Sequence, residues 1–160
     1  MSWKPSEQGD PPALDAEQKA KTCPSRACEE RVQLLGVMTT SGRLAFISPP
    51  VRVDAGFVSR AKADGRPEQR FRFSGPCVED GCPQWTGHRC AVADVVISEV
   101  RAAPTEGRRL PACTIRRTCR WYAQNGAAAC AVCPEVVADT GGTGTFRSLV
   151  AGTEDFERRA

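Results

Sequence analysis

Cysteine is the residue type whose number and spacing in this chain could do chemistry. Seven of the nine cysteines fall within residues 77–133, a stretch that ends in Cys130-Ala-Val-Cys133-Pro134. Thiols crowded in this way must be cross-linked, hold a metal or do redox chemistry. The other two are Cys23 and Cys28, and the single histidine, His88, lies inside the crowded stretch. The function of the chain is therefore expected in this stretch.

Composition favours metal binding over disulfides. The N-terminal residues contain no apolar run typical of a secretory signal, and no apolar run of the chain approaches the about 18 residues that cross a bilayer. We therefore predict a cytoplasmic protein without membrane insertion, because thiols stay reduced and disulfides are rare in that compartment. The odd number of nine cysteines would also leave one thiol over in any fully paired disulfide scheme.

The second half of the stretch contains a complete set of cluster ligands. A [4Fe–4S] cluster needs four converging thiolates, and Cys-x2-Cys followed by proline is a recurrent part of such sites. The pattern Cys-x5-Cys-x10-Cys-x2-Cys-Pro predicts one cluster on four ligands: Cys113, Cys119, Cys130 and Cys133. Trp121 and Tyr122 follow Cys119, and we expect them to cover the cluster and tune its reduction potential.

The first half of the stretch is one ligand short. Its pattern, Cys-x4-Cys-x7-Cys, predicts a second [4Fe–4S] cluster on Cys77, Cys82 and Cys90. The fourth ligand could be Cys23, Cys28 or His88. If none of these three completed the site, one iron would be open to a substrate, and the protein could then be catalytic.

Structural zinc is the first alternative, since it takes four thiolate or imidazole ligands. One zinc set would be Cys77, Cys82, His88 and Cys90, and the other would be the four cysteines of residues 113–133. A zinc-stapled chain would be a binding module that contacts a protein or nucleic-acid partner through residues 108–121, from Arg108 to Trp121.

Dithiol redox chemistry at Cys130 and Cys133 is the second alternative. Active dithiols of this kind usually follow a strand and begin a helix, which lowers the pKa of the thiol. The sequence before Cys130 is Gly126-Ala-Ala-Ala, which is not strand-like. This alternative also leaves the other five clustered cysteines unexplained.

The charge pattern suits a cluster better than a nucleic acid. Residues 107–134 contain no acidic side chain, and arginines there could offset the charge of roughly −2 on a cluster with four cysteines. These arginines are Arg108, Arg109, Arg116, Arg117 and Arg120. Residues 76–160 as a whole carry equal numbers of basic and acidic side chains, and the net charge of the chain is only +3, so a nucleic-acid partner is not favoured.

Catalytic constellations are missing from the sequence. No paired-carboxylate or Ser/His/Asp set can be argued, because His88 is the only histidine that could act as a base. We therefore predict an electron carrier, or the cluster-bearing accessory subunit of a redox complex, rather than a stand-alone enzyme. Such a protein implies a protein redox partner.

The first half of the chain is predicted to form a small β structure. Apolar, β-prone runs at residues 32–38 and 43–47, separated by a turn with Gly42, predict a hairpin whose second strand ends at Ser48-Pro-Pro. Asp54 is expected to cap a short helix that ends near Ala63. Residues 69–73 alternate polar and aromatic and predict a third strand with its phenylalanines facing inward.

The second half is predicted to be loops and helices. Helical patterns cover residues 91–100, 114–125 and 127–138, and Pro134 interrupts the last one. The β-branched content of residues 91–100 also allows a strand there. The predicted fold class is α+β, with the β-hairpin and strand forming a front lobe packed on a cysteine-rich lobe organised by metal clusters. We predict a flexible leader over residues 1–22, one metal-binding domain over 23–139 with the cysteine-rich lobe at 76–139, and a flexible tail over 140–160.

Two segments of the chain also resemble a known group of proteins. They are Pro76-Cys-Val-Glu-Asp-Gly-Cys-Pro-Gln-Trp-Thr-Gly-His-Arg-Cys90 and Leu110-Pro-Ala-Cys-Thr-Ile-Arg-Arg-Thr-Cys-Arg-Trp-Tyr-Ala-Gln-Asn-Gly-Ala-Ala-Ala-Cys-Ala-Val-Cys-Pro134. This pattern resembles a group of small bacterial cysteine-rich proteins, some of which carry labels such as iron–sulfur or nitrogen-fixation protein. The resemblance covers roughly residues 23–140 and implies an iron–sulfur role in a bacterial protein.

Overall fold

A computed structural model describes residues 20–99 and 109–138 of the chain. Its strands form one antiparallel sheet in the order β1-β4-β2-β3. The strands are β1 (Thr22–Arg26), β2 (Gln33–Met38), β3 (Leu44–Arg52) and β4 (Phe71–Pro76). The helices are α2 (Ala55–Ala63), α3 (Ala91–Glu99), α4 (Arg120–Asn125) and α5 (Ala127–Val132), with short 3₁₀ turns η1 (Pro67–Gln69), η2 (Glu79–Gly81) and η3 (Cys133–Glu135).

The predicted α+β class is confirmed, and so are several of its elements. Strands β2 and β3 form the expected hairpin, and Gly42 in its turn has a φ of 78°, a conformation that costs glycine little. Asp54 caps α2 by accepting a hydrogen bond from the Phe57 N–H at 2.7 Å. These elements were predictable because each depends on residues close together in the sequence.

The sheet differs from the prediction at its two edges. Strand β3 does not end at Ser48-Pro-Pro but continues to Arg52, which pairs with Gln33. Proline is tolerated there because β3 is an edge strand and the register shifts between Leu34 and Gly36. Strand β1 was not predicted at all; it pairs with β4 and supplies the other edge of the sheet.

The third predicted strand is present as β4, but its polar side chains are not exposed. Phe73 is fully buried as expected. Its two polar neighbours in the strand, Arg72 and Ser74, are fully buried too. The physical reason is the place of β4 in the sheet. An inner strand with β1 on one side and β2 on the other, covered on both faces, has no solvent face.

The helices predicted in the second half of the chain are present, but one of them is shorter than predicted. Helix α3 matches residues 91–100, and α5 followed by η3 matches the helical segment interrupted near Pro134. The helix predicted over 114–125 begins only at Arg120. The backbone at Cys119 is extended, because Cys119 forms a parallel β-bridge with Thr22 and serves as the N-cap of α4.

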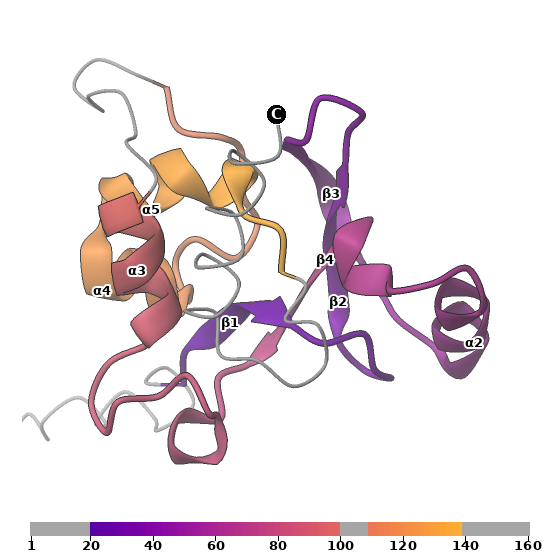
Figure 1. The fold of residues 1–160 in the computed structure, drawn as a ribbon, viewed down its shortest axis with the longest axis horizontal. Helices are drawn as coiled ribbons and strands as arrows, with labels where there is room; N and C mark the ends of the chain where they lie inside the picture. Colours follow the sequence, from indigo (N-terminus) through magenta and orange to yellow (C-terminus); the bar gives the residue numbers. More distant parts are fainter. Residues whose placement is uncertain (1–19, 100–108, 139–160) are drawn as a thin grey trace, which may run out of the picture.

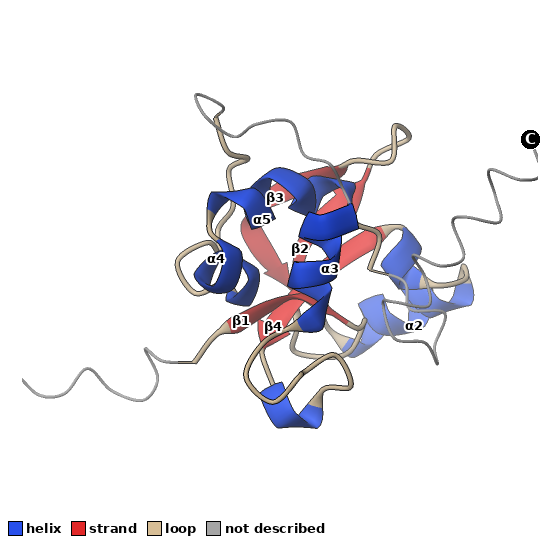
Figure 2. Cartoon of the chain, turned by 60° about the vertical axis from the view of Figure 1, so that its left-hand side comes forward, coloured by secondary structure: helices blue, strands red, loops and turns tan. Residues whose placement is uncertain are grey.

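The sheet separates two hydrophobic cores. Helices α3, α4 and α5 gather on one side of the sheet and α2 lies on the other (Figures 1 and 2). The core on the α2 side contains Cys28, Val32, Leu34, Val53, Ala61 and Phe73. The core on the other side contains Val92, Ala93, Val96, Cys119, Trp121, Ala129, Val132 and Val136.

The predicted leader and tail fall almost wholly outside the described residues. Within the described part of the chain, no helix is long and apolar enough to cross a membrane.

Candidate metal centre

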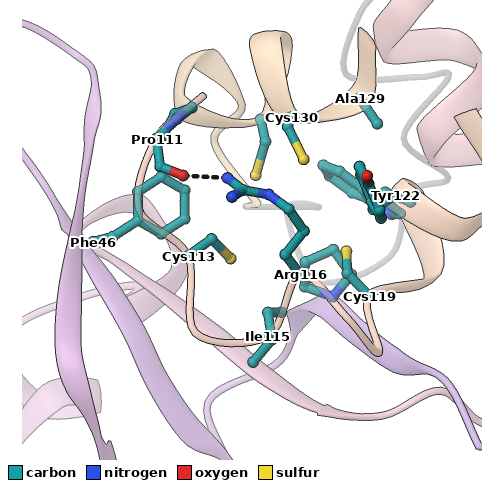
Figure 3. Close-up of a pocket in the computed structure, with 12 residues that line it drawn as sticks. Phe46, Pro111, Cys113, Ile115, Arg116, Cys119, Tyr122, Ala129 and Cys130 are labelled. Carbon is teal, nitrogen blue, oxygen red and sulfur yellow. Dashed lines mark hydrogen bonds between the residues drawn. The ribbon is translucent and has the colours of Figure 1, made fainter. Parts of the chain in front are cut away.

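Four cysteines that the sequence groups together line one pocket between the helices and the sheet. They are Cys113, Cys119, Cys130 and Cys133. The rest of the lining is largely apolar and includes Pro24 of β1, Phe46 of β3, Trp121 and Ala129. Figure 3 shows Cys113 on the loop before α4, Cys119 at the start of α4 and Cys130 on α5, with their side chains around a common hollow. The structure therefore brings all four predicted ligands of the first cluster to one place.

Local geometry explains this convergence. Cys130 and Cys133 are three residues apart across the end of α5 and the start of η3, so they share one face of a helical turn. Gly126 has a φ of 63° and joins α4 to α5, which turns α5 back beside α4. Cys119 begins α4 and is held by its β-bridge to Thr22, so β1 fixes the side of the pocket opposite α5.

A buried arginine from the sheet reaches this pocket. Arg72 of β4 has no exposed surface, and its guanidinium donates a hydrogen bond to the Sγ of Cys133 at 3.4 Å. It also donates to the carbonyl oxygens of Cys133 and Val136, and it lies 5.9 Å from the ring centre of Trp121. The Nε of Arg72 has no partner, and no carboxylate within the described ranges pairs with this cation.

A second arginine lines the hollow. Figure 3 shows the side chain of Arg116 reaching between Cys113, Cys119 and Cys130, and its guanidinium donates to the carbonyl oxygen of Pro111. Its Nε is buried and has no partner. Two cations thus contact different thiols of the same pocket. The sequence predicted one of them, since Arg116 was among the arginines expected near the cluster.

Burial favours the neutral form of three thiols of the pocket in the absence of a metal. Burial raises the pKa of Cys119 to about 11, and the neighbouring Cys133 and Cys113 add to the rise. Burial also raises the pKa of Cys133 and of Cys113, while Arg72 acts against the rise at Cys133 and Arg116 acts against it at Cys113. The metal-free pocket therefore combines neutral thiols with a buried, unpaired cation.

The remaining cysteines are divided between two places. Cys77 directly follows β4, and Cys82 and Cys90 lie at the two ends of the loop between η2 and α3; all three are partly buried. Cys23, in β1, interacts electrostatically with all three. Cys28 lies in the α2-side core instead, where its N–H donates to Glu68 at 2.7 Å. His88, the other possible ligand, is exposed.

Within residues 20–99 and 109–138, no three His, Cys, Asp or Glu side chains form a group arranged to hold a single metal ion. The cysteines of the pocket line a hollow instead of meeting at one point.

Two contributors to the pocket were not predicted from the sequence. Arg72 alternates with the phenylalanines that were predicted to face inward, so the sequence did not predict its burial, and Pro24 lies in a strand that was not predicted. An available signal was the position of Arg72 five residues before Cys77, in a strand that leads into the cysteine-rich stretch.

Comparisons with known proteins add no assignment. No family model matches the chain, and neither the curated proteins nor the solved structures contain a significant match. The resemblance to small cysteine-rich bacterial proteins stays a prediction from the sequence.

Proposed function

We propose that this protein is an iron–sulfur protein that acts in electron transfer, either as a free carrier or as the cluster-bearing subunit of a redox complex. The first [4Fe–4S] cluster would be held by four thiolates, those of Cys113, Cys119, Cys130 and Cys133. The observation that carries the proposal is the buried guanidinium of Arg72, which donates to the sulfur of one of these cysteines.

The buried positive charge of Arg72 requires a counter-charge. Burying an ion without a counter-charge costs several kcal/mol in real proteins, so buried ions are normally paired. The hydrogen bonds of Arg72 lead only to a thiol sulfur and two carbonyl oxygens. A cluster with four cysteine ligands carries roughly −2 and accepts hydrogen bonds at its sulfurs. Loading the pocket with such a cluster would therefore give Arg72 the anion that residues 20–99 and 109–138 do not provide.

The arrangement of the thiols favours a cluster over zinc. Tetrahedral geometry with Zn–S bonds of about 2.3 Å requires four sulfurs about 3.8 Å from one another. A cluster places its irons and sulfides between the ligands, so its cysteines must stand around a space. Cysteines that line a hollow meet the second requirement better than the first.

When bound, the cluster would supply reversible one-electron redox chemistry, and the chain's own residues would control it. Trp121 is only 2% exposed and, with Ala129, forms part of an apolar wall that excludes water. Arg72 favours the more negative, reduced state because it donates to a ligand sulfur. Tyr122 lines the same pocket but is 37% exposed, so the pocket approaches the surface there, where a redox partner could dock.

Elemental analysis of anaerobically purified protein tests the proposal. We expect a brown protein with broad absorbance near about 400 nm, acid-labile sulfide and about four irons for each loaded site. Cys133→Ala should lose the iron of the first site. A colourless protein with stoichiometric zinc and no sulfide would overturn the proposal and support the zinc-stapled binding module.

A further inference from the structure

We propose that Cys23 of strand β1 joins Cys77, Cys82 and Cys90 in a second site with four thiolates, which binds a cluster of the same class as the first. This inference rests on the proposed iron–sulfur function. It names the ligand that the sequence pattern of residues 77–90 lacks.

The β-ladder brings Cys23 and Cys77 together. Cys23 is the direct partner of Gly75 in the antiparallel pairing of β1 with β4, and the Cys77 N–H donates to the carbonyl of Lys21 at 2.8 Å, which extends this pairing. The side chains of two directly paired residues point to the same face of the sheet. Along one strand, residues two positions apart also share a face. Cys77 lies two positions after Gly75, so it shares a face with Cys23 as a diagonal neighbour.

A compact loop brings Cys82 and Cys90 together. The Trp85 N–H donates to the carbonyl of Cys82 at 3.0 Å, and Trp85 forms an antiparallel β-bridge with Cys90. Residues 86–89 close the turn between them through a hydrogen bond from the Thr86 N–H to the carbonyl of Arg89 at 2.9 Å. The two cysteines therefore lie at the base of one hairpin-like turn.

Contacts to helix α4 connect these two pairs. Gln124 of α4 accepts a hydrogen bond from the Cys90 N–H and donates to the Cys90 carbonyl, both at 2.9 Å. Cys119, the N-cap of α4, forms a β-bridge with Thr22, which is next to Cys23.

The segment that contains Cys82 contacts the start of the same helix. Arg120, the first residue of α4, pairs with Glu79 and lies over the ring of Trp85 at 4.9 Å from its centre. Helix α4 thus contacts β1 and the segment of residues 79–90 together.

The two rival ligands are placed less favourably. His88 is exposed in the turn of residues 86–89, away from the base of the turn where the cysteines lie. Cys28 belongs to the core on the α2 side and is 2% exposed. Its backbone N–H donates to Glu68 at 2.7 Å.

If Cys23 is the fourth ligand of the second site, each of the two sites has four protein ligands. An iron open to substrate is no longer required at the second site, so the protein fits an electron carrier better than a catalyst.

The two sites are also adjacent. Thr22, next to Cys23, forms a β-bridge with Cys119 of the first site, and neighbouring strands lie about 4.8 Å apart. Strand β1 thus contributes Cys23 to one site and Pro24 to the other.

Iron and sulfide content of the full-length protein, purified anaerobically, tests this ligand set. We expect about eight irons in the wild type and about half as many in Cys23→Ala, Cys77→Ala and Cys119→Ala, since each variant loses one site. His88→Ala and Cys28→Ala are the matched controls for the rival ligands and should keep the full iron content. Full content in Cys23→Ala, or half in either control, would overturn the assignment.

The result separates this inference from the proposed function. A wild type with about four irons, lost in Cys119→Ala and kept in Cys23→Ala, would overturn the second site and leave the proposed function intact. A wild type without iron and sulfide would overturn both.

A second variant covers the case in which Cys23→Ala does not fold. Cys23→Ser nearly keeps the size of the side chain, and its far-ultraviolet circular dichroism shows whether it folds. It should contain about half the iron of the wild type. Full iron content in folded Cys23→Ser would overturn the assignment.

Discussion

The guanidinium of Arg72 donates a hydrogen bond to the sulfur of Cys133 across 3.4 Å, and this contact joins the middle of the sheet to the cysteine pocket. Arg72 is fully buried and comes from β4, while Cys133 begins the 3₁₀ turn η3, 61 positions later in the chain. A sheet residue thus holds a positive charge against a proposed cluster ligand, and two predictions follow from that charge.

Replacement of Arg72 should lower the reduction potential of the first cluster. Arg72→Met removes a donor and a positive charge, which together favour the reduced state. Hydrogen bonds to charged groups contribute about 1.5–3 kcal/mol. For a one-electron couple this corresponds to a decrease of at most roughly 60–130 mV. A redox titration followed by visible absorbance measures the shift, and Arg72→Lys, which keeps the charge but not the planar fork, should fall between the two. An unchanged or higher potential in Arg72→Met would contradict the role.

Without metal, the same substitution should have the opposite effect on stability. Replacing buried ion pairs by apolar residues of similar volume is often neutral or stabilising by about 1–4 kcal/mol, because each buried ion has lost its hydration, and Arg72 lacks even the partner that offsets this loss. Metal-free Arg72→Met should therefore unfold at an equal or higher denaturant concentration than the metal-free wild type. In the loaded proteins, the wild type should be the more stable of the two. If the metal-free variant were strongly destabilised, the main role of Arg72 would be its bonds to the carbonyls of Cys133 and Val136.

Filling the hollow should exclude the first cluster while the fold persists. Ala129 is buried on α5 and lines the pocket, so Ala129→Leu would place a larger side chain in the space between the cysteines. Leucine is nearly as good a helix former as alanine, and overpacking costs typically about 1–3 kcal/mol. The variant should retain its far-ultraviolet circular dichroism and lose the iron of the first site. Ala127→Leu is the control, because Ala127 is exposed on the same helix. Equal iron content in the two variants would show that the cluster does not occupy this hollow.

The sequence was sufficient to predict what depends on local pattern. The set Cys113, Cys119, Cys130 and Cys133 could be grouped because its spacing alone suggested four converging ligands, and the structure gathers these residues around one pocket. The hairpin of β2 and β3 and the cap at Asp54 are also local signals. Their turn or capping residues are adjacent in the chain to the elements that they define.

Non-local pairing explains what the sequence could not predict. Whether Arg72 is exposed depends on which strands flank β4, and both flanking strands lie earlier in the chain. The same pairing of β1 with β4 brings Cys23 beside Cys77, across 54 positions of sequence. Spacing patterns contain no information on such register, so the fourth ligand stayed open among three candidates.

A carboxylate clamp positions Cys90 and should make the protein sensitive to acid. The side-chain amide of Gln124 on α4 accepts from the Cys90 N–H and donates to the Cys90 carbonyl, both at 2.9 Å. Asp94 accepts from Gln124 and Asn125, each at 3.1 Å, and Arg89 donates to both of its carboxylate oxygens. Asp94 therefore orients the amide that holds Cys90 against α4.

The hydrogen bond from Arg89 holds the pKa of Asp94 well below its ordinary value of 3.8, with Asn125 and Gln124 acting in the same direction and burial acting against them. Because the folded value lies below the unfolded one, ionised Asp94 contributes stability above pH 3.8, and this contribution is lost as the pH falls below that value. Stability of the metal-free wild type, measured by denaturant unfolding at successive pH values, should therefore fall more steeply below about pH 4 than that of Asp94→Asn. Glu135→Gln is the control, since it removes an exposed ion pair with Arg43 that should contribute little. Parallel pH profiles for the wild type and Asp94→Asn would show that the clamp does not stabilise the fold.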